Sequence, residues 1–369
     1  MNKKILFCIN DLSLAGAENI TFNVFIGLIN SNKISRDSTI LLLHNQIDDL
    51  FLSVIDGMGL NVYVVNKRKN RFILIDILLS IFKLFCFLKN NKYDTIYVNL
   101  FPSLFVFSIL NKVKFTNKSK LIFTEHSVSN NRPKNFIYMF IEKLIYKEYD
   151  TIICISENVK SALVNRVGNI SKIQIICNGL PPLLLNEFNR IDIRTELKIP
   201  SDSILLLMTS RVGDGKDHLT LLKSFELIFD DNLYLIFIGD GDFSNVINTI
   251  TSEKVKNNVK LLGKRKDARL IMKEVDINIL SSAYEGISGV TLEAFASNRP
   301  YLGSNVDGIR ELVGTSLSLF EFGNKIDLAE KISMILNYKD ISEKIVELNL
   351  IKLKEYDFNL QLTKLLEIL

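Results

Sequence analysis

Two glutamates eight residues apart flank a short loop in the second half of the chain. The stretch SSAYEGISGVTLEAFASNRP, residues 281–300, contains Glu285 and Glu293. An apolar run precedes it and GVTLEAFAS resembles the start of a helix, so we expect Glu285 in the loop and Glu293 about one turn into the helix. Free amides at a helix start bind anions, and a nearby carboxylate can accept hydrogen bonds from two ribose hydroxyls. An ordinary strand-to-helix turn with two solvated glutamates would have the same sequence.

A second loop carries two cations beside glycines. In TSRVGDGKDHLTLL, residues 209–222, Arg211 and Lys216 flank the segment VGDG between a predicted strand and a predicted helix. Arginine can bind a phosphate bidentately and lysine acts as a compact charge, so both could bind one diphosphate. A surface turn with two solvated cations is the alternative. Together, however, the two loops supply cations, helix amides and a ribose acceptor, which favours a nucleoside diphosphate as ligand.

The segment IGDGD, residues 238–242, invites two other interpretations. It lacks the third glycine of G-x-G-x-x-G, so a nicotinamide cofactor is not favoured. Asp240 and Asp242 imitate a D-x-D metal motif, but the cations of the neighbouring loop make a diphosphate-bound metal unnecessary. We interpret the segment as a tight turn that lines the ligand cleft, and we predict no metal.

The first half offers weaker signals. Gly16 and Ala17 stand between a predicted strand and a predicted helix that has Glu18 in its first turn, and small residues there would let a ligand approach the backbone. His126 follows the strand KLIFT, where it would face a cleft between two domains. A structural histidine is an equally good interpretation of that position.

The elements that must position these residues alternate along the chain. Short apolar runs alternate with helix-length segments, as in a parallel α/β sheet whose strands are covered on both faces. The alternation lapses between residues 180 and 201, where three of the six prolines occur, and then restarts. We therefore predict an α/β protein with two doubly wound, Rossmann-like domains, residues 1–185 and 186–352. A final helix, residues 353–369, could pack back on the first domain.

Charge and cysteine usage narrow the classes of partner. Residues 1–189 carry 22 Lys and Arg against 14 Asp and Glu, whereas residues 190–369 carry 23 against 27. The basic half suggests an anionic partner, but no recognisable nucleic-acid module is present, so nucleic acid is not expected. The four cysteines stand singly in apolar runs, which predicts buried thiols and a cytoplasmic location. The apolar run near the start is too short for a signal peptide.

One segment of the first half suggests a membrane surface. RFILIDILLSIFKLFCFLKNNKY, residues 71–93, follows the basic run KRKNR, and a helix would gather Asp76, Ser80 and Lys83 on one narrow stripe. These charges, in so short an apolar segment, argue against a transmembrane span. We expect a helix that packs on the sheet of the first domain and also contacts anionic lipid, which would give peripheral binding at the inner face of the cell membrane.

The motifs resemble those of GT-B retaining glycosyltransferases of family four, described as glycosyl transferases group 1. SRVGDGKDHLTLLKSF, LYLIFIGDGD, VKLLGKRKDARL, DINILSSAYEGISGVTLEAFASNRP and VDGIREL follow the family's order, and LAGAE, TEH, ISENVK and ICNGL are shorter matches. The resemblance implies a catalytic role for Arg211, Lys216, Glu285 and His126: the two cations on the donor's diphosphate, Glu285 near the transferring sugar and His126 against that sugar. It places Glu293 on the ribose. It further implies donor contacts at Gly16, Gly239, Leu262, Gly263, Gly286, Ile287, Ser288, Gly289 and Val290, and an acceptor side formed by Ala15, Gly16, Ala17 and Glu18. Ala15 replaces the usual first glycine of that loop.

The resemblance implies transfer of a sugar from a nucleotide-diphosphate sugar to a cell-surface glycan precursor, with retention at the anomeric carbon. We expect a UDP-sugar first and a GDP-sugar as the alternative, with a lipid-linked oligosaccharide as acceptor. Two other functions stay open: a nucleotide-sugar epimerase of the same fold, and a non-catalytic nucleotide-binding partner subunit.

Overall fold

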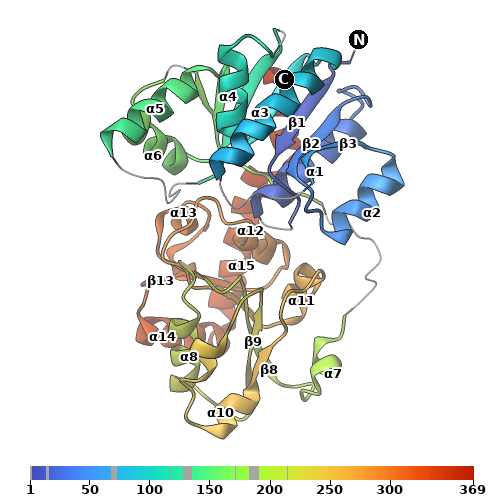
Figure 1. Ribbon diagram of the computed structural model, residues 1–369. Helices are drawn as coiled ribbons and strands as arrows, with labels where there is room; N and C mark the ends of the chain where they lie inside the picture. The colour runs from blue at the N-terminus through green and yellow to red at the C-terminus, as the bar shows by residue number, and fades with distance from the viewer. Residues whose placement is uncertain are drawn as a thin grey trace. The chain divides into compact units, whose positions relative to one another are not determined.

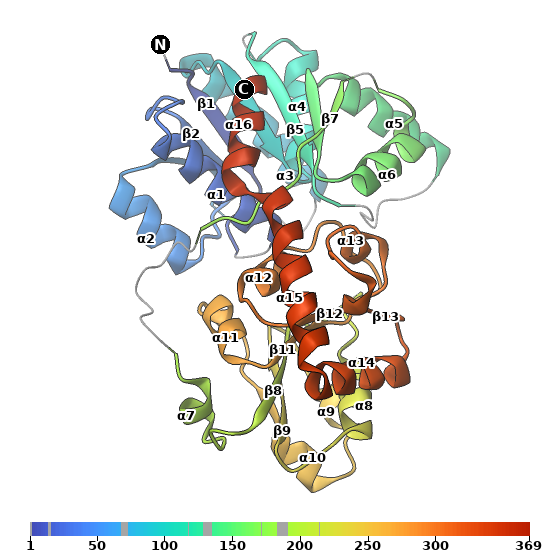
Figure 2. The same ribbon diagram turned by 180° about the vertical axis from the view of Figure 1, so that it is seen from behind.

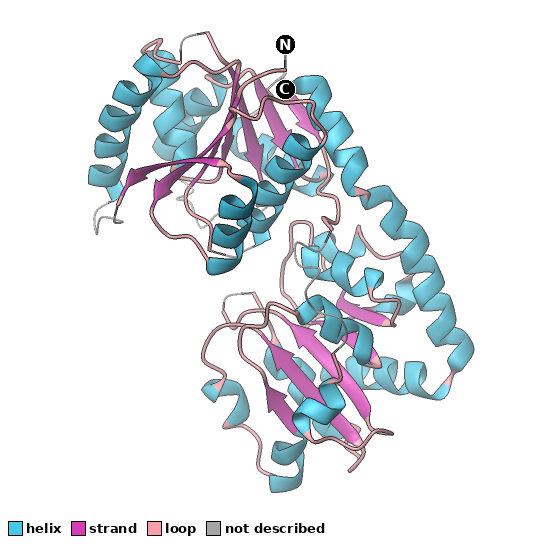
Figure 3. Ribbon diagram, turned by 90° about the vertical axis from the view of Figure 1, so that its right-hand side faces the viewer, coloured by secondary structure: helices cyan, strands magenta, loops and turns pink. Residues whose placement is uncertain are grey.

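The protein forms two compact units. The computed structural model describes residues 2–13, 16–67, 73–116, 118–127, 135–170, 172–182, 191–213 and 215–369. Unit 1 comprises Met1–Leu184 and Phe358–Leu369, and unit 2 comprises Leu185–Asp357. In each unit a parallel sheet lies between layers of helices, as the magenta strands and cyan helices of Figure 3 show. The predicted α/β class with two Rossmann-like sheets is confirmed.

Unit 1 is built on a parallel sheet with the strand order β3-β2-β1-β4-β5-β6-β7 in its described residues. The strands are β1 (Ile5–Ile9), β2 (Thr39–His44), β3 (Asn61–Asn66), β4 (Thr95–Asn99), β5 (Lys120–Glu125), β6 (Thr151–Cys154) and β7 (Ile173–Ile175). The central strand β1 is buried along its whole length, as expected for a strand covered on both faces.

The helices of unit 1 cover both faces of this sheet. They are α1 (Gly16–Asn30), α2 (Asp49–Met58), α3 (Ile73–Asn90), α4 (Ser103–Lys112), α5 (Phe136–Lys147), α6 (Glu157–Val167) and α16 (Phe358–Ile368). Residues of α1, α2 and α16 share one apolar core with the strands, and Figure 2 shows α16 in red on that face. On the other face, α3 contacts α4, α4 contacts α5 and α5 contacts α6 (Figure 1).

The C-terminal helix begins later than the sequence suggested. Residues 339–353 form α15 and belong to unit 2, and a short 3-10 turn over Lys354–Tyr356 follows. The backbone becomes extended at Asp357, so α16 starts at Phe358 and not at residue 353. Its packing on unit 1 is tight: a Cβ at Gly27 of α1 would lie 2.7 Å from Leu362. The division after Leu184 falls one residue before the predicted boundary.

Unit 2 repeats the topology of unit 1 with the strand order β10-β9-β8-β11-β12-β13. The strands are β8 (Ile204–Thr209), β9 (Leu233–Ile238), β10 (Val259–Leu261), β11 (Ile277–Leu280), β12 (Tyr301–Ser304) and β13 (Leu319–Phe320). The helices are α7 (Ile193–Leu197), α8 (His218–Leu227), α9 (Ser244–Ile247), α10 (Glu253–Asn258), α11 (Ala268–Glu274), α12 (Gly289–Ala296), α13 (Asp307–Arg310), α14 (Lys325–Asn337) and α15 (Lys339–Leu353).

In both units the strand order reverses beside the first strand. Ligands of such sheets bind outside the carboxyl ends of the strands at this reversal, which lies between β1 and β4 in unit 1 and between β8 and β11 in unit 2. The two loops singled out in unit 2 follow β8 and β11, so the fold brings them to the same point.

The exposure of the cysteines and the apolar character of the helices test two predictions made from the sequence. Cys8 and Cys154 are buried, but Cys177 is half-buried and Cys86 is exposed, so the prediction of four buried thiols is wrong. Cys86 lies on α3, whose side chains on one side of the helix face solvent. Within the described part of the chain, no helix has the length and apolar character needed to cross a bilayer.

Candidate functional site

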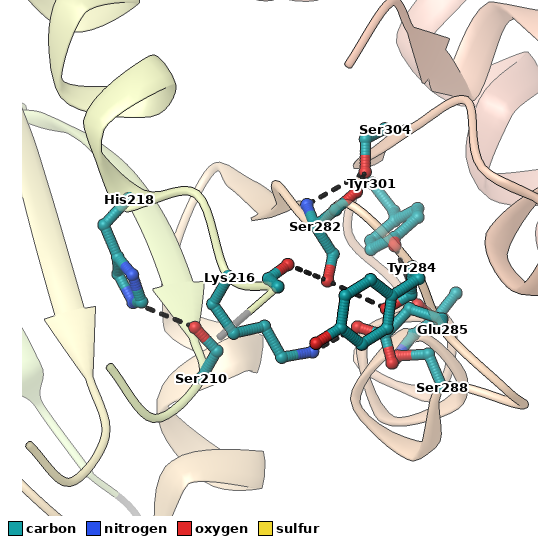
Figure 4. Close-up of polar contacts among 11 residues, drawn as sticks. Ser210, Lys216, His218, Ser282, Tyr284, Glu285, Ser288, Tyr301 and Ser304 are labelled. Carbon is teal, nitrogen blue, oxygen red and sulfur yellow. Dashed lines mark hydrogen bonds and ion pairs between the residues drawn. The ribbon is translucent and has the colours of Figure 1, made fainter. Parts of the chain in front are cut away.

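The loops after β8 and β11 are joined by backbone contacts. Lys216 and Ser282 form an antiparallel bridge, and the amide of Ala283 donates to the carbonyl of Gly215 over 2.7 Å. The Ser282 hydroxyl donates to the same carbonyl over 2.8 Å. These contacts make the two predicted loops one continuous surface (Figure 4).

Lys216 and Glu285 form an ion pair within this surface. The ammonium group of Lys216 donates to Oε1 of Glu285, and the two side chains are 21% and 13% exposed. Figure 4 shows the lysine side chain extending toward the carboxylate beside the ring of Tyr284. The pair joins a cation predicted for a diphosphate to a carboxylate predicted for a sugar. An anionic ligand could compete with Glu285 for the lysine.

Tyr284 lies against a glycine that no other residue could replace without strain. Gly215 has a φ of +83°, and a Cβ there would lie 2.7 Å from the tyrosine ring. The ring is 50% exposed. Sequence reasoning gave Tyr284 no role, because only the pairing of the two loops brings it over Gly215.

The loop that contains Glu285 is also fixed by contacts with β12 and α13. The Ser282 amide donates to the hydroxyl of Ser304 over 2.9 Å, and that hydroxyl donates to the carbonyl of Ser282 over 2.6 Å. At Gly308 in α13, a Cβ would lie 2.3 Å from the carbonyl oxygen of Glu285 and 2.1 Å from that of Gly286. These backbone contacts restrict where Glu285 can move.

The start of α12 supplies the predicted helix amides. Ser288 is the N-cap, and its hydroxyl accepts from the amide of Thr291 over 3.3 Å. Gly289 and Val290 are the first two helical residues, so their amides have no acceptor within the helix. Ile287 and Ser288 therefore lead directly into a terminus that favours negative charge.

Glu293 lies in different surroundings from Glu285. It is one turn into α12, facing Arg269 of α11. Burial raises the pKa of the Glu293 carboxyl, and the charge of Arg269 opposes that shift. Burial in turn lowers the pKa of Arg269. Sequence reasoning did not identify Arg269, since only the contact between α11 and α12 makes it a neighbour.

The exposed Arg211 lies in a loop that is fixed to the turn over residues 238–242. The amide of Val212 donates to the carbonyl of Asp240 over 2.8 Å, and a Cβ at Gly239 would lie 1.9 Å from the carbonyl oxygen of Ser210. Gly239 donates in turn to the carbonyl of Gly263 over 2.9 Å. The loops that contain Arg211, Gly239 and Gly263 are thus neighbours, and Leu262 precedes the last of them.

Asp240 and Asp242 are both exposed. The carboxylate of Asp242 accepts from the amide of Ser244 over 2.8 Å, and this hydrogen bonding lowers its pKa. The aspartate therefore stabilises the turn that leads into α9. No three His, Cys, Asp or Glu side chains among the described residues lie close enough together to hold a metal ion. Metal-independent activity stays a prediction.

Buried polar atoms gather where the strand order reverses in unit 2. The hydroxyl of Ser210 lies 2.9 Å from Nε2 of His218, and burial lowers the pKa of this histidine. Nδ1 of His218 and the hydroxyls of Thr209 and Ser281 are buried and have no hydrogen-bond partner among the described residues. Sequence reasoning missed His218, since the helix start D-H-L gives no sign of the contact with Ser210.

In unit 1, His126 lies at the carboxyl end of β5, as predicted. Its Nε2 is 3.0 Å from Oδ1 of Asn99, which ends the neighbouring strand β4. Burial lowers the pKa of His126 to about 4, so the ring is neutral at pH 7. The hydroxyl of Thr21 in α1 also approaches Asn99, at 3.3 Å.

The loop before α1 is only partly described. Gly16 is the first residue of α1, and apart from its chain neighbours and its own helix backbone, no atom of the described residues lies within 4 Å of the position where a Cβ would stand. Ala17 and Glu18 are half-buried in the first turn, and Glu18 is the acidic residue there. Ala15 lies outside the described residues.

Comparison with known families covers most of the chain. Residues 189–349 match the model of the glycosyl transferases group 1, and residues 51–182 match the model of glycosyltransferase family 4. The chain is a GT-B glycosyltransferase of family four.

Solved structures show the same fold for this glycosyltransferase. The Anabaena protein Alr3699/HepE in complex with UDP and glucose superposes with a TM-score of 0.80 at 19% identity, covering 100% of this chain and 99% of the other. A glycosyltransferase from Rickettsia africae gives a TM-score of 0.80 at 21% identity, covering 100% and 98%.

The matches to curated relatives cover less of each chain than the matches to solved structures do. An Escherichia coli UDP-Gal:alpha-D-GlcNAc-diphosphoundecaprenol alpha-1,3-galactosyltransferase is 26% identical over 64% of this chain and 63% of its own length. An uncharacterized glycosyltransferase of Methanocaldococcus jannaschii is 25% identical over 64% of this chain and 62% of its own length. The matches to these two relatives therefore span under two thirds of their length.

Proposed function

We propose that this glycosyltransferase transfers a hexose-type sugar from a UDP-sugar to a lipid-linked glycan precursor, with retention at the anomeric carbon. The product would enter a cell-surface polysaccharide such as an O-antigen or a capsule. Relatives support this class of acceptor: one is named for a diphosphoundecaprenol substrate, and another is an O-antigen biosynthesis glycosyltransferase of Escherichia coli. Anabaena Alr3699/HepE, which shares the fold, was solved with UDP and with UDP-glucose.

The joined loops of unit 2 carry the proposal. They pair Lys216 with Glu285 beside the start of α12, and Arg211 precedes Lys216 in the loop after β8. When the bond between the anomeric carbon and the diphosphate breaks, both electrons stay on the departing oxygen. Fixed cations and helix amides stabilise that growing negative charge, an effect that is often the largest in catalysis. No side chain is assigned as a covalent nucleophile.

The Lys216–Glu285 ion pair gives the donor a defined entry step. The diphosphate would take Lys216 from Glu285, which leaves the carboxylate free to contact hydroxyls of the transferring sugar. Glu293 would accept from the ribose, and the residues near Leu262 and Gly263 would meet the base. The roles of Gly16 and His126 beside the donor sugar rest on the family resemblance alone.

The proposal includes no metal, because Arg211, Lys216 and the helix terminus already supply positive charge to the leaving group. It also includes a cytoplasmic enzyme that contacts the membrane peripherally, since a lipid-linked acceptor lies at that surface. A UDP-sugar is preferred over a GDP-sugar because Anabaena Alr3699/HepE, which shares the fold, was solved with UDP and with UDP-glucose.

Release of free nucleoside diphosphate from a panel of nucleotide sugars tests the proposal. With donor and a lipid-linked acceptor, wild-type protein should release UDP. Arg211→Ala or Lys216→Ala should lower kcat/KM about 10- to 150-fold, the loss expected for one charge-assisted hydrogen bond. Lys254→Ala is the matched control, because Lys254 lies on α10 with its side chain 75% exposed. It should behave as wild type.

Two results would contradict the proposal. Near-normal turnover in the Arg211→Ala, Lys216→Ala double variant would show that these two side chains do not bind the diphosphate of the donor. Interconversion of nucleotide sugars without any acceptor would identify an epimerase, and UDP binding without turnover of any sugar would identify a non-catalytic subunit.

A further inference from the structure

Helix α3 of unit 1 directs polar side chains inward and apolar ones outward. Asp76 lies 3.1 Å from Nε2 of His44, and the hydroxyl of Ser80 accepts from Asn66 over 2.8 Å. Lys83 donates to Oδ1 of Asn66 over 2.9 Å. The stripe predicted from the sequence therefore exists, but it faces the protein. The solvent side consists of large apolar residues, which are Ile75, Leu78, Leu79 and Phe82 with exposed fractions of 43%, 67%, 44% and 69%.

Helix α5 has the same inverted arrangement. Its inner face carries the fully buried Glu142, paired with Arg166 of α6, and Tyr146, whose hydroxyl donates to Glu125 over 2.5 Å. Its outer face carries the residues that we call the α5 ridge: Phe136, Ile137, Phe140, Ile141 and Leu144, exposed by 83%, 72%, 54%, 42% and 39%. Successive members are one and three residues apart, which aligns them on one side of the helix.

Helix α4 lies between these two helices. It contacts both α3 and α5, and Figure 1 shows the three side by side on one face of the unit 1 sheet. Ile109 on α4 and Val113 and Phe115 just after it are exposed by 39%, 52% and 40%. The ring of Phe115 packs edge-on against Phe85 of α3, with centroids 4.2 Å apart. An apolar surface spread over three helices exceeds the scattered apolar residues of an ordinary soluble surface.

The charges on these helices have one sign at the surface. Across α3, α4 and α5 the carboxylates are Asp76 and Glu142, and both are buried. Apart from Lys83, which bonds to Asn66, the lysines of these helices and of the turn after α4 are mostly exposed, and they are Lys89, Lys112, Lys114, Lys118, Lys143 and Lys147. Large apolar side chains with lysines around them and no exposed carboxylate are typical of a surface that binds anionic lipid.

We propose that the outer face of α3, α4 and α5 docks unit 1 on an anionic lipid bilayer, with the α5 ridge inserted at the boundary between head groups and acyl chains. The lysines would contact lipid phosphates. The docking rests on the proposed function in one respect: that function supplies the reason for docking, which is access to a lipid-linked acceptor. The binding itself needs neither donor nor turnover, so it can be tested apart from catalysis.

Vesicle flotation of the full chain tests the docking. At low salt the protein should float with vesicles of phosphatidylethanolamine and phosphatidylglycerol and should bind phosphatidylcholine vesicles weakly. Phe136→Ser with Phe140→Ser should weaken binding to the anionic vesicles at least about tenfold, because two large aromatic side chains no longer enter the lipid. Leu227→Ser with Ile326→Ser is the matched control in unit 2, where these residues are exposed by 54% and 58%. It should float as wild type does.

The absence of tryptophan from the chain allows a local readout. Phe140→Trp places a single reporter on the α5 ridge, and Tyr338→Trp places one at an exposed aromatic position of unit 2. With anionic vesicles, the emission of the ridge reporter should shift to the blue and be quenched by brominated lipid. The emission of the unit 2 reporter should stay unchanged.

Three outcomes would overturn the docking. The first is flotation of the double serine variant at wild-type level, and the second is a ridge reporter that brominated lipid does not quench. The third is wild-type protein that floats with neither vesicle. If that protein also forms dimers that the serine variant abolishes, the surface is a contact between two copies of this chain. A loss of flotation with intact release of UDP from the donor leaves the proposed sugar transfer standing, and the converse leaves the docking standing.

Discussion

The loops of unit 2 and the start of α1 in unit 1 differ in how crowded their glycines are. In unit 2, a Cβ at Gly215, Gly239 or Gly308 would meet neighbouring atoms at 2.7, 1.9 and 2.1 Å. At Gly16, the first residue of α1, no such neighbour lies within 4 Å among the described residues, and the same holds for Gly289 at the start of α12. Both sheets reverse their strand order at the corresponding point. Crowding by neighbouring atoms therefore restricts the loops of unit 2, whereas the first residue of α1 has room for a side chain.

The largest effect expected from this comparison is on folding. Gly239→Ala should lower the free energy of unfolding by about 3 kcal/mol or more, because the new methyl group would overlap the carbonyl of Ser210 and the backbone must shift. Gly16→Ala should change it by less than about 0.5 kcal/mol, since nothing lies near that position. Urea denaturation measures both. Equal stabilities of the two variants would remove the contrast between the units.

A second prediction separates donor binding from turnover in unit 2. Glu285→Gln should bind UDP about two- to fivefold more tightly, because Lys216 no longer exchanges one negative partner for another. Turnover should nevertheless fall by about 10-fold or more, since the carboxylate proposed for the sugar is gone. Calorimetric titration with UDP and initial rates give the two values.

The matched control for this variant is Glu226→Gln, which breaks a lysine–glutamate pair on α8 of the same unit. It should leave both values near those of wild type. Weaker UDP binding in Glu285→Gln would mean that the ion pair positions Lys216 for the diphosphate and does not compete with it.

A third prediction uses the pH dependence of stability in unit 1. The folded pKa of His126 is about 4, below its ordinary value of 6.5, so the unfolded chain binds more protons between these values. The free energy of unfolding should therefore be unaffected above pH 6.5 and should fall as the pH drops toward 4, by up to about 3 kcal/mol. His126→Gln should flatten this part of the curve. His218 should still cause some loss, because burial lowers its pKa as well.

The smallest effect is expected for the carboxylates of the turn beside Arg211. Asp242→Asn should keep turnover within about twofold of wild type, because Asp242 only accepts from the amide of Ser244 in the turn before α9, and a side-chain amide oxygen can still accept there. Chelation with EDTA should likewise leave turnover unchanged. Loss of activity in EDTA with recovery on addition of manganese would instead support the D-x-D interpretation and would make the turn part of the catalytic site.

The sequence was sufficient for the fold and for the meeting of the two loops of unit 2. Apolar runs separated by helix-length segments predicted parallel sheets, and loops after central strands converge in such sheets. It was not sufficient for the contacts that hold the loops. Tyr284 over Gly215, and Gly308 against the carbonyl of Glu285, depend on backbone approach between elements far apart in sequence.

The orientation of helices on the sheet was harder to predict. The stripe of Asp76 and Ser80 faces inward because its partners, His44 and Asn66, end the strands β2 and β3. A periodic pattern identifies a polar stripe on a helix, but it does not show whether that stripe faces the sheet or the solvent. The apolar residues of α5 carry the same ambiguity: their spacing would suit a core as well as an exposed surface.

The position of α16 has a consequence for biosynthesis. Phe358, Leu362, Leu365 and Leu369 belong to the apolar core of unit 1, yet they follow all of unit 2 in the chain. On the ribosome, the synthesis of unit 2 is therefore completed before α16 can pack against the α1 side of unit 1. Nascent chains of this protein would expose that apolar face until residue 369 has left the exit tunnel. We expect chaperones to bind the exposed face during this interval.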